Sequence, residues 1–459
     1  MHPSASVRRR HADAPAPPGP SAPCDAACNR LPAPGARCAA QLEPELEPEL
    51  EPEPLPEQHG ARLRVRLHAL LGVLLLSPLL LVLALAACTV KDKSTVSVKP
   101  QLVPAELFVA PDGLDSNPGT RAAPLRSLAR AAELVTPGVI VNVLPGVYQG
   151  GFRTTVDGLP EARIVFRSTR RWGARILPPP VSNAGSSSKM AWDNRASYVD
   201  IEGFEVDGSL RPGKPGGRWT IGIYSGGSHD RIFGNHVHDI ATTLPCDSGG
   251  GSGIGVDSYY RGKDSEVNGN SVHDIGPPGC RYVQGIYFAT TGSIRNNIVY
   301  RVAEAGIHLW HDAREVVIAN NTVAASNTGI LVGGGDFYHT QGPDDHTRVF
   351  NNIVFDNRYG ISEQGATGRH NSYRNNLVFK NSEGDWQLAK GMSHSGTVTQ
   401  APRFVDYRRD GTPDFRLAAH SPAIGRGLDA DIVPGADGPD FNGKPRARAA
   451  AIDIGACQH

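Results

Sequence analysis

Five side chains that could bind or transform a sugar occupy equivalent places in the middle of this 459-residue chain. Each follows the isoleucine of a Gly-Ile unit by one position or by three, and the set is Tyr224, Asp257, Tyr287, His308 and Trp310. Aromatic faces give a sugar ring an apolar surface to stack on, while carboxylates and imidazoles bind hydroxyl groups and transfer protons. These residue types therefore indicate a carbohydrate site, provided that the fold brings them together.

The elements that would position these side chains are repeats. A Gly-Ile unit begins at residues 222, 253, 285, 306, 329 and 360, and an Asn-x-Val unit begins at residues 235, 270, 297, 321, 352 and 376. Successive Gly-Ile units lie 31, 32, 21, 23 and 31 residues apart, a spacing typical of a solenoid whose repeats bury their apolar faces against each other. Short segments rich in Val and Ile and broken by Gly and Asn predict strands. We therefore expect an all-β chain folded as a parallel β-helix.

The alternation of side chains along a strand predicts which residues face outward. In the segment around His308, the core needs Ile307 and Leu309, so His308 and Trp310 must point away from it. The same rule places Ile254 inward and Asp257 outward. Because neighbouring coils stack about 4.8 Å apart, we expect the five side chains to align on one exposed sheet face, as an oligosaccharide groove.

This face could cleave an acidic polysaccharide by β-elimination. The reaction needs a base for the C5 proton, an acid for the leaving oxygen and a positive group that neutralises the uronate carboxylate. We expect His308 to be the base and Tyr287 the acid, with Lys263 as the other candidate base. Arg261 and Arg314 lie close in sequence to the groove strands and are expected to bind the carboxylate.

Other functions stay open on this reading. A glycoside hydrolase would need converging carboxylates, for which Asp257, Asp312, Asp336 and Glu363 are available. The series of Asn-x-Asp, Asp-Asp and Gly-x-Gly-His motifs of polygalacturonases does not appear, and the pair Asp344-Asp345 is expected in a loop and not on the groove strands. An epimerase could use the same fold, and a non-catalytic glycan-binding or adhesion protein would explain the aromatic face without any proton transfer.

Both ends of the folded part resemble a known group of proteins. The segments that carry the resemblance are residues 107–113, 117–120 and 124–128 before the repeats, and residues 402–406, 414–417, 421–425 and 453–456 after them. They are similar to the corresponding parts of secreted right-handed β-helix proteins, including the pectate-lyase family 9 and chondroitinase B-like groups. The resemblance implies a single-stranded, right-handed parallel β-helix whose N-terminal cap contains a short helix, and a polysaccharide as the partner.

The same resemblance raises the question of calcium. In family 9 lyases a lysine base works beside a cluster of aspartates that holds the ion. In this chain Asp257 and Lys263 are the matching candidates, but the sequence shows no convincing match to that cluster. Calcium at Asp257 is therefore the cofactor that the resemblance implies, and no other feature of the sequence requires one.

A second row of polar residues follows the Asn-x-Val units. His238 with Asp239 and His273 with Asp274 occupy matching places, and imidazole with carboxylate suits a metal ion. The alternative is a stack of polar turn residues. The asparagine of each unit is expected to be structural, with its amide bonded to the asparagines of the coils above and below.

The N-terminal region predicts export. Residues 1–61 form a Pro- and Glu-rich disordered leader, which an error in the assigned start codon would equally explain. Residues 62–88 combine basic residues with an apolar run that ends in Leu-Ala-Ala-Cys, which resembles the lipobox of bacterial lipoproteins. An uncleaved transmembrane anchor is the alternative. Lipidation of Cys88 would attach the protein to the outer membrane or cell surface through a tether of residues 89–104.

The repeats, the charge and the cysteines set the remaining expectations. The N-terminal cap and first coils occupy residues 105–195, the coils of the β-helix residues 196–400, and a C-terminal cap segment residues 401–459. The 46 basic and 46 acidic residues cancel, which argues against a nucleic-acid partner, and we expect a monomer. Cys246 and Cys280 precede neighbouring Gly-Ile units and are expected to form a disulfide in an oxidising compartment.

Overall fold

The computed structural model describes residues 105–179, 189–209, 219–243, 250–429, 431–433, 435, 438–446 and 452–459. All of them belong to the second of two compact units, Arg62–His459. The predicted leader, signal, lipidation site at Cys88 and tether lie outside the described residues, and so does Cys246. In the part of the chain that the structure describes, no helix combines the length and the apolar character needed to cross a membrane.

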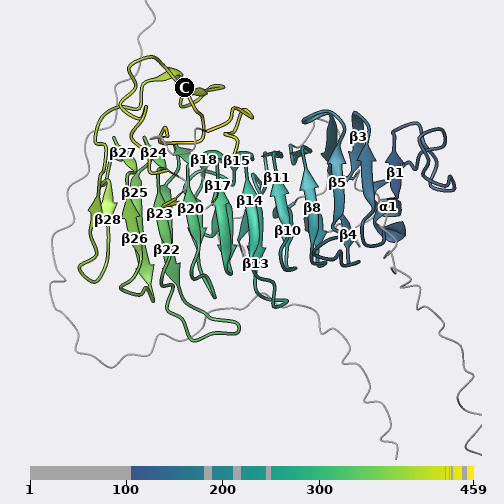
Figure 1. Cartoon of the computed structure of the whole chain (residues 1–459), viewed down its shortest axis with the longest axis horizontal. Coiled ribbons are helices and arrows are strands. Elements are labelled where there is room, and N and C mark those ends of the chain that lie inside the picture. Colours follow the sequence, from purple (N-terminus) through teal and green to yellow (C-terminus); the bar gives the residue numbers. More distant parts are fainter. Residues whose placement is uncertain are drawn as a thin grey trace, which may run out of the picture. The chain divides into compact units, whose positions relative to one another are not determined.

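The chain winds around one axis, and each complete coil contributes one strand to each of three parallel sheets that run along it (Figure 1). The Gly-Ile sheet contains β4 (Phe152–Thr154), β7 (Met190–Asn194), β10 (Ile221–Ser225), β13 (Gly251–Asp257), β16 (Val283–Ala289), β19 (Ala305–Leu309), β22 (Thr328–Gly334), β25 (Tyr359–Gly365) and β28 (Trp386–Gln387). The Asn-x-Val sheet contains β3 (Gly146–Gln149), β6 (Ala174–Leu177), β9 (Glu205–Asp207), β12 (His236–His238), β15 (Ser271–Ile275), β18 (Ile298–Val302), β21 (Thr322–Ala324), β24 (Ile353–Phe355) and β27 (Leu377–Phe379).

The third sheet joins the other two and is the longest. It contains β1 (Glu106–Val109), β2 (Ile140–Val143), β5 (Ile164–Ser168), β8 (Val199–Glu202), β11 (Arg231–Phe233), β14 (Ser265–Asn268), β17 (Gly292–Arg295), β20 (Val317–Ala319), β23 (Arg348–Phe350), β26 (Ser372–Arg374) and β29 (His394–Ser395). Every pairing within the three sheets is parallel, for example β13 with β16 and β15 with β18. The prediction of an all-β parallel β-helix is confirmed.

A short helix closes the first coils, as predicted. Helix α1 (Leu128–Leu134) begins after Ser127, whose hydroxyl accepts a hydrogen bond from the backbone N–H of Arg130 and so caps the first turn. Its buried face, formed by Leu128, Ala131 and Ala132, belongs to the same apolar core as the coils. Because this face covers the core at the first coil, the apolar interior of the solenoid is not left open there.

The core is built from two invariant rows. The isoleucines of the six Gly-Ile units pair in register along the Gly-Ile sheet, and the valines of the Asn-x-Val units do the same along theirs. All of these side chains are fully buried. The period-2 alternation therefore points the repeated apolar residues into the helix and leaves the variable positions outside.

In five of the six Gly-Ile units, the glycine is required by the valine row. A Cβ atom added at Gly306 would lie 2.3 Å from a methyl group of Val323, and one at Gly329 would lie 2.3 Å from a methyl group of Val354. Gly222, Gly253 and Gly285 show the same close approach to their valines. The two halves of the repeat thus touch across the interior, and only a residue without a side chain fits at this position.

Replacing Gly306 by alanine should therefore destabilise the protein by about 2 kcal/mol, the usual cost of overpacking a close-packed core. Gly306 has no positive φ, so the effect would come from packing and not from backbone strain. Urea unfolding followed by circular dichroism measures it. Gly411→Ala is the matched control, because a Cβ there meets only the flexible side chain of Arg408. Equal stability of the two variants would contradict the packing argument.

Asparagine side chains bind the coils together at the corner between the third sheet and the Asn-x-Val sheet. The amide of Asn321 donates to the oxygen of Asn352 at 2.9 Å, and its own oxygen accepts from the amide of Asn297 at 2.9 Å. The same oxygen accepts from the backbone N–H of Asn297 at 3.0 Å. All of these asparagines are fully buried. The predicted structural role of the repeated asparagine is confirmed.

The C-terminal segment packs on the outer face of the middle and last coils (Figure 1). It includes an antiparallel hairpin of β30 (Phe404–Asp406) and β31 (Asp414–Leu417). Phe415 and Cys457 pack on Tyr300, while Leu417 belongs to an apolar cluster with Phe355. The Asn-x-Val sheet therefore turns an apolar outer surface toward this segment in its later coils.

Cys280 is buried and disulfide-bonded. Its predicted partner, Cys246, lies outside the described residues, so that pairing stays a prediction.

Candidate functional site

The structure brings the five predicted side chains together on the outer face of the Gly-Ile sheet, but in two rows. The register places Tyr224 beside Gly255, Gly255 beside Tyr287, and Tyr287 beside His308. Asp257 lies two residues further along β13, where it pairs with Ala289. Trp310 directly follows β19, at the same end of the strands. Asp257 therefore lies on the same face as the tyrosines, one outward position further along the strands.

Tyr224 and Asp257 are joined across the two rows. The phenol of Tyr224 donates a hydrogen bond of 2.7 Å to Asp257 Oδ1, which also accepts from the backbone N–H of Tyr259. Tyr224 is only 5% exposed, so the expectation that it stands on the open surface is wrong. Burial is the main cause that raises the pKa of Asp257, although the two hydrogen bonds oppose it. Tyr224 thus orients the carboxylate and does not offer a free ring to a ligand.

Tyr287 and His308 form the centre of the face. Their rings meet edge to face with centroids 5.4 Å apart, and both residues are half-buried. Burial lowers the pKa of His308 to about 3, with a smaller contribution from His311. Its Nε2 atom is buried and has no hydrogen-bond partner among the described residues. At neutral pH the ring is therefore an uncharged imidazole with one nitrogen that the protein leaves unsatisfied.

The indole ring of Trp310 packs against three glycines. Cβ atoms added at Gly333, Gly335 and Gly365 would all lie within 3 Å of its ring. The indole N–H of Trp310 points to Asp336 Oδ2 at 3.4 Å. The glycines of the next two coils thus leave the space that the indole occupies, which fixes the ring in one orientation.

Two aromatic residues that the sequence reasoning missed extend this face. His311 and Tyr338 stack with centroids 4.0 Å apart, and the phenol of Tyr338 lies 2.8 Å from His311 Nε2. His311 Nδ1 lies 2.7 Å from the carbonyl oxygen of Asp336. His311 directly follows Trp310, where strand alternation would have predicted an inward side chain, and its positive φ of 47° shows that the strand pattern has ended. Tyr338 comes from the loop after β22, and the repeat pattern does not predict where that loop lies.

A second missed group lies on the first coils of the same sheet. Asp193 is the neighbour of Tyr224 in the outward row, and it pairs with Arg153 at 2.7 Å and with Arg195. Arg195 also stacks over the ring of Tyr260 at 3.9 Å. Two guanidinium groups thus share one carboxylate and leave a net positive charge at this end of the face. These coils lack the Gly-Ile unit, so the repeat gave no reason to include them.

The predicted cations lie elsewhere. Lys263 and Arg261 are exposed in the turn between β13 and β14, and Arg314 is exposed in the turn between β19 and β20. Within the described part of the chain, no hydrogen bond or ion pair joins these three side chains to the face. The structure therefore does not bring them to the tyrosine–histidine pair.

Two of the carboxylates available to a hydrolase are engaged in holding loops. Asp312 accepts hydrogen bonds from the Ser258 hydroxyl at 2.7 Å and the Thr340 hydroxyl at 2.8 Å. Glu363 accepts from the phenol of Tyr373 at 2.7 Å and from the backbone of Ala389 at 2.8 Å. Neither is free to act on a sugar, which leaves Asp257 and Asp336 as the remaining carboxylates near Tyr287.

The residues of this face do not fit calcium. The ion takes six to eight oxygen ligands, several of them carboxylates. Here Asp257 is bound by Tyr224 and Asp193 is paired with two arginines. Among the described residues, the groups of His, Cys, Asp or Glu close enough to share a metal ion include none on this face. We therefore derive no step through calcium.

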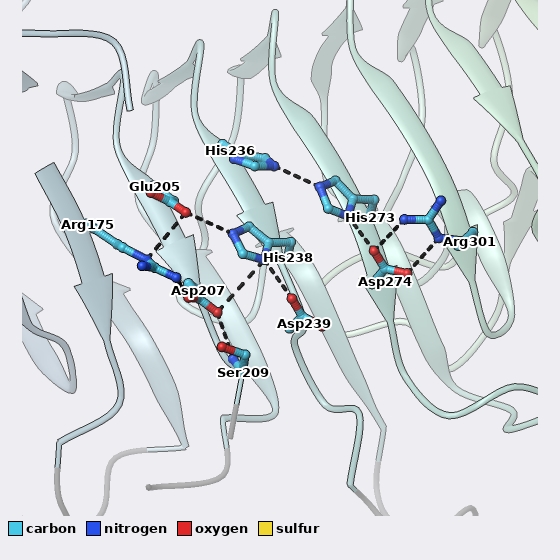
Figure 2. Close-up of polar contacts among 10 residues, drawn as sticks. All are labelled: Arg175, Glu205, Asp207, Ser209, His236, His238, Asp239, His273, Asp274 and Arg301. Carbon is cyan, nitrogen blue, oxygen red and sulfur yellow. Dashed lines mark hydrogen bonds and ion pairs between the residues drawn. The ribbon is translucent and has the colours of Figure 1, made fainter. Parts of the chain in front are cut away.

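The other predicted metal candidates lie on the outer face of the Asn-x-Val sheet, in the coils before the apolar ones. Figure 2 shows that His238 and His273 are neighbours there, and that their surroundings include Glu205, Asp207 and His236. Burial lowers the pKa of His236 to about 3 and also lowers that of His273. For His238, burial is outweighed by its carboxylate partners, which raise the pKa. The sequence reasoning found His238, Asp239, His273 and Asp274 and missed Glu205, Asp207 and His236.

A family model described as right handed beta helix region matches residues 194–395. Pectate lyase L of Dickeya dadantii is 25% identical over 392 residues, which cover 73% of this chain and 89% of that protein. The uncharacterized protein YwoF of Bacillus subtilis is 28% identical over 171 residues, which cover 37% of this chain and 36% of YwoF. The crystal structure of pectate lyase Pel9A has a TM-score of 0.54 and 18% identity, and the match covers 77% of this chain and 96% of that one.

The fold and these matches define the chain as a right-handed parallel β-helix protein. It is similar to pectate lyases of family 9, as the two ends of the repeat region predicted.

Proposed function

We propose that this protein is a carbohydrate-active β-helix protein, a polysaccharide lyase that cleaves a uronate polymer by β-elimination on the outer face of the Gly-Ile sheet. The observation that carries the proposal is the pair of Tyr287 and His308 at the centre of that face, with an uncharged imidazole whose Nε2 has no protein partner. The similarity to pectate lyases over most of the chain supports the same class of substrate.

The polymer would lie along the helix axis, across successive coils. Tyr224 and His308 are three coils apart, or about 14 Å at the usual spacing of strands. The net positive group of Arg153, Asp193 and Arg195 lies at one end of this path, where it attracts the carboxylate of a bound uronate. Trp310 lies at the other end and offers its ring to a sugar face.

The chemistry then needs two proton transfers. His308 removes the proton from C5 of the uronate with its ring lone pair, and the electrons of that C–H bond form the C4–C5 double bond. The C4–O bond breaks, and the leaving oxygen takes a proton from the phenol of Tyr287. Burial raises the pKa of Tyr287 well above its ordinary value, so the phenol is fully protonated and can act as the acid. The products are one chain with a new end and one with an unsaturated uronate.

An assay of the full-length chain against a panel of uronate polymers tests the proposal. We expect ultraviolet absorbance of the unsaturated uronate with at least one acidic polymer and none with neutral ones. Each polymer is assayed with added calcium and with a chelator, because the described residues of the face hold no calcium-type ligand set. Absence of product on every acidic polymer under both conditions would overturn the lyase.

A non-catalytic glycan-binding protein is the second candidate, and one observation favours it. The Nε2 atom of His308 is buried, so a substrate reaches it only after neighbouring side chains move. A binder needs no such movement. Binding of a polymer without any product, measured on the same panel by calorimetry, would establish this second function in place of the first.

Replacing Trp310 by alanine should weaken polymer binding about tenfold under either function, because a ring that stacks on a sugar contributes about 1.4 kcal/mol. Calorimetry with the best polymer of the panel measures the loss. Phe233→Ala is the matched control, since Phe233 is an exposed aromatic residue on the third sheet. Equal losses in both variants would show that the Gly-Ile face is not the binding surface.

We also propose that the protein is exported and held at the cell envelope by a lipid on Cys88. The disulfide at Cys280 supports an oxidising compartment, where such bonds persist. Mass spectrometry of the protein isolated from its own membranes should find an acyl-modified N-terminal Cys88, and Cys88→Ala should release the protein from the membrane. An unmodified Cys88 in membrane-bound wild-type protein would exclude the lipid anchor.

A further inference from the structure

The cluster on the outer face of the Asn-x-Val sheet has the arrangement of a metal site. His238 Nδ1 lies 2.7 Å from Asp239 Oδ2, and His273 Nδ1 lies 2.6 Å from Asp274 Oδ2 (Figure 2). Asp274 is in turn held by two nitrogens of Arg301, each at 2.6 Å. A carboxylate behind Nδ1 fixes the tautomer of an imidazole and leaves the Nε2 lone pair available, which is the usual second shell of a metal-binding histidine.

The same hydrogen bonds decide the tautomer of His236. Because Asp274 accepts the proton of His273 Nδ1, an uncharged His273 carries its lone pair on Nε2. That atom lies 2.7 Å from His236 Nε2, so His236 must donate there. The free lone pair of His236 is therefore on Nδ1. The contacts that run from Arg301 through Asp274 to His273 thus leave the Nδ1 lone pair of His236 available for a metal ion.

Glu205 completes the set. Its Oε1 lies 3.2 Å from His238 Nε2, the nitrogen that carries the lone pair when the ring is uncharged and Nδ1–H donates to Asp239. One ligand atom from each of Glu205, His236 and His238 lies within 4.8 Å of the other two. In a tetrahedral zinc site with bonds of about 2.0 Å, neighbouring ligand atoms lie about 3.3 Å apart. The three groups therefore need to approach by at most about 1.5 Å.

We propose that Glu205, His236 and His238 bind a divalent transition-metal ion of the zinc type. Two imidazoles and one carboxylate suit such an ion, whereas calcium and magnesium prefer oxygen ligands alone. Three protein ligands leave one coordination position for water or another ligand. The proposal is independent of the lyase, because the cluster lies on a different sheet from the tyrosine–histidine pair.

Two further features of the cluster agree with a divalent cation. Among the residues drawn in Figure 2, four carboxylates and two arginines leave a net charge of −2 when the imidazoles are neutral. His236 and His273 also line a pocket of about 430 Å³ between this sheet and the C-terminal segment. The pocket walls include Tyr300, Arg301 and Phe415. One of the three proposed ligands, His236, therefore lies on the wall of a cavity.

The test is calorimetric titration of the untagged full-length chain with zinc chloride alone, with the bound metal counted by mass spectrometry after dialysis. We expect one zinc ion per chain. His238→Ala should weaken binding at least about 100-fold, because it removes a ligand. His370→Ala is the matched control. His370 belongs to a separate cluster with Asp345 and His346 in which both histidines are exposed, and its loss should change the affinity of the described site less than twofold.

A second variant keeps the test valid if His238→Ala does not fold. Among the described residues, the Asp239 side chain hydrogen-bonds only to His238 Nδ1, and it is 39% exposed, so Asp239→Asn should fold normally. It should weaken zinc binding about 10- to 100-fold through the second shell. Cobalt bound in place of zinc should give the intense visible bands of a low-coordinate site in the wild type. Failure of the wild type to bind zinc, or loss of binding in His370→Ala but not in Asp239→Asn, would overturn the proposal.

Discussion

Lyase activity should fall about 10²- to 10⁴-fold when His308 is replaced by alanine, because the variant lacks the group that removes the C5 proton. The loss should lie in kcat and not in KM, since the polymer contacts of Trp310 and the Arg153–Asp193–Arg195 group remain. Tyr287→Phe should show a loss of similar kind, because it keeps the ring and removes the acid. Initial rates of unsaturated-uronate formation measure both.

Lys263→Ala is the control for this experiment. Lys263 is exposed in the turn between β13 and β14 and has the charge, but not the position, of a base for this face. It should keep nearly full activity. Full activity in His308→Ala together with loss in Lys263→Ala would move the base to the lysine and contradict the assignment.

The pH profile gives a further check on the same residue. Burial lowers the pKa of His308 to about 3. The ring should therefore remain an unprotonated base down to about pH 5, and kcat/KM should not decline between about pH 7 and pH 5 through this group. A decline centred near the ordinary histidine pKa of about 6.5 would mean that His308 is solvated in the working enzyme.

Asn321→Ala should be the most destabilising single change among the polar residues, at about 3 kcal/mol or more. Asn321 is fully buried and its side chain joins two coils, with hydrogen bonds to Asn297 and Asn352. Its amide also donates to the backbone carbonyl of Ile294 at 2.9 Å. Removal leaves several buried donors and acceptors without partners, each costing about 1–3 kcal/mol.

Urea unfolding compares this variant with Asn117→Ala, in which a part-buried amide loses one hydrogen bond, to the carbonyl of Pro124 at 2.8 Å. The control should lose about 1 kcal/mol or less. A loss at Asn321 no larger than at Asn117 would show that the coils tolerate an empty corner. That outcome would contradict the structural role of the repeated asparagine, which is to bond neighbouring coils together.

The sequence predicted the scaffold well because the scaffold is what repeats. The Ile and Val rows, the Asn corner and the inward direction of Ile307 all follow from a pattern that each coil restates. The outward residues are single occurrences, and their contacts depend on register and on loops. Alternation alone predicted that Tyr224 is exposed. Its phenol instead donates a hydrogen bond to Asp257, which lies two positions after Gly255, the partner of Tyr224 on the neighbouring strand.

In the polar cluster on the Asn-x-Val sheet, too, the repeat pattern predicted some members and not others. His238 and His273 were found because they follow Asn-x-Val units, whereas Glu205 belongs to a coil without that unit. His236 is the variable residue inside the unit itself, so its outward direction could have been read from the alternation. What could not be read is that the chain of contacts from Arg301 to His236 assembles across three coils.

The packing of the C-terminal segment has a consequence for cooperativity. A simple solenoid has only local contacts, so its coils can form and melt one after another. Here Arg446 bonds to Asn296 across 150 residues, and the backbone N–H of Ala456 donates to the Thr322 hydroxyl. Arg446 and Ala456 thus complete coils that were synthesised long before them. These late, long-range contacts tie the middle coils to both residues, so that this half of the β-helix should unfold as one unit and should stay incomplete until both have been synthesised.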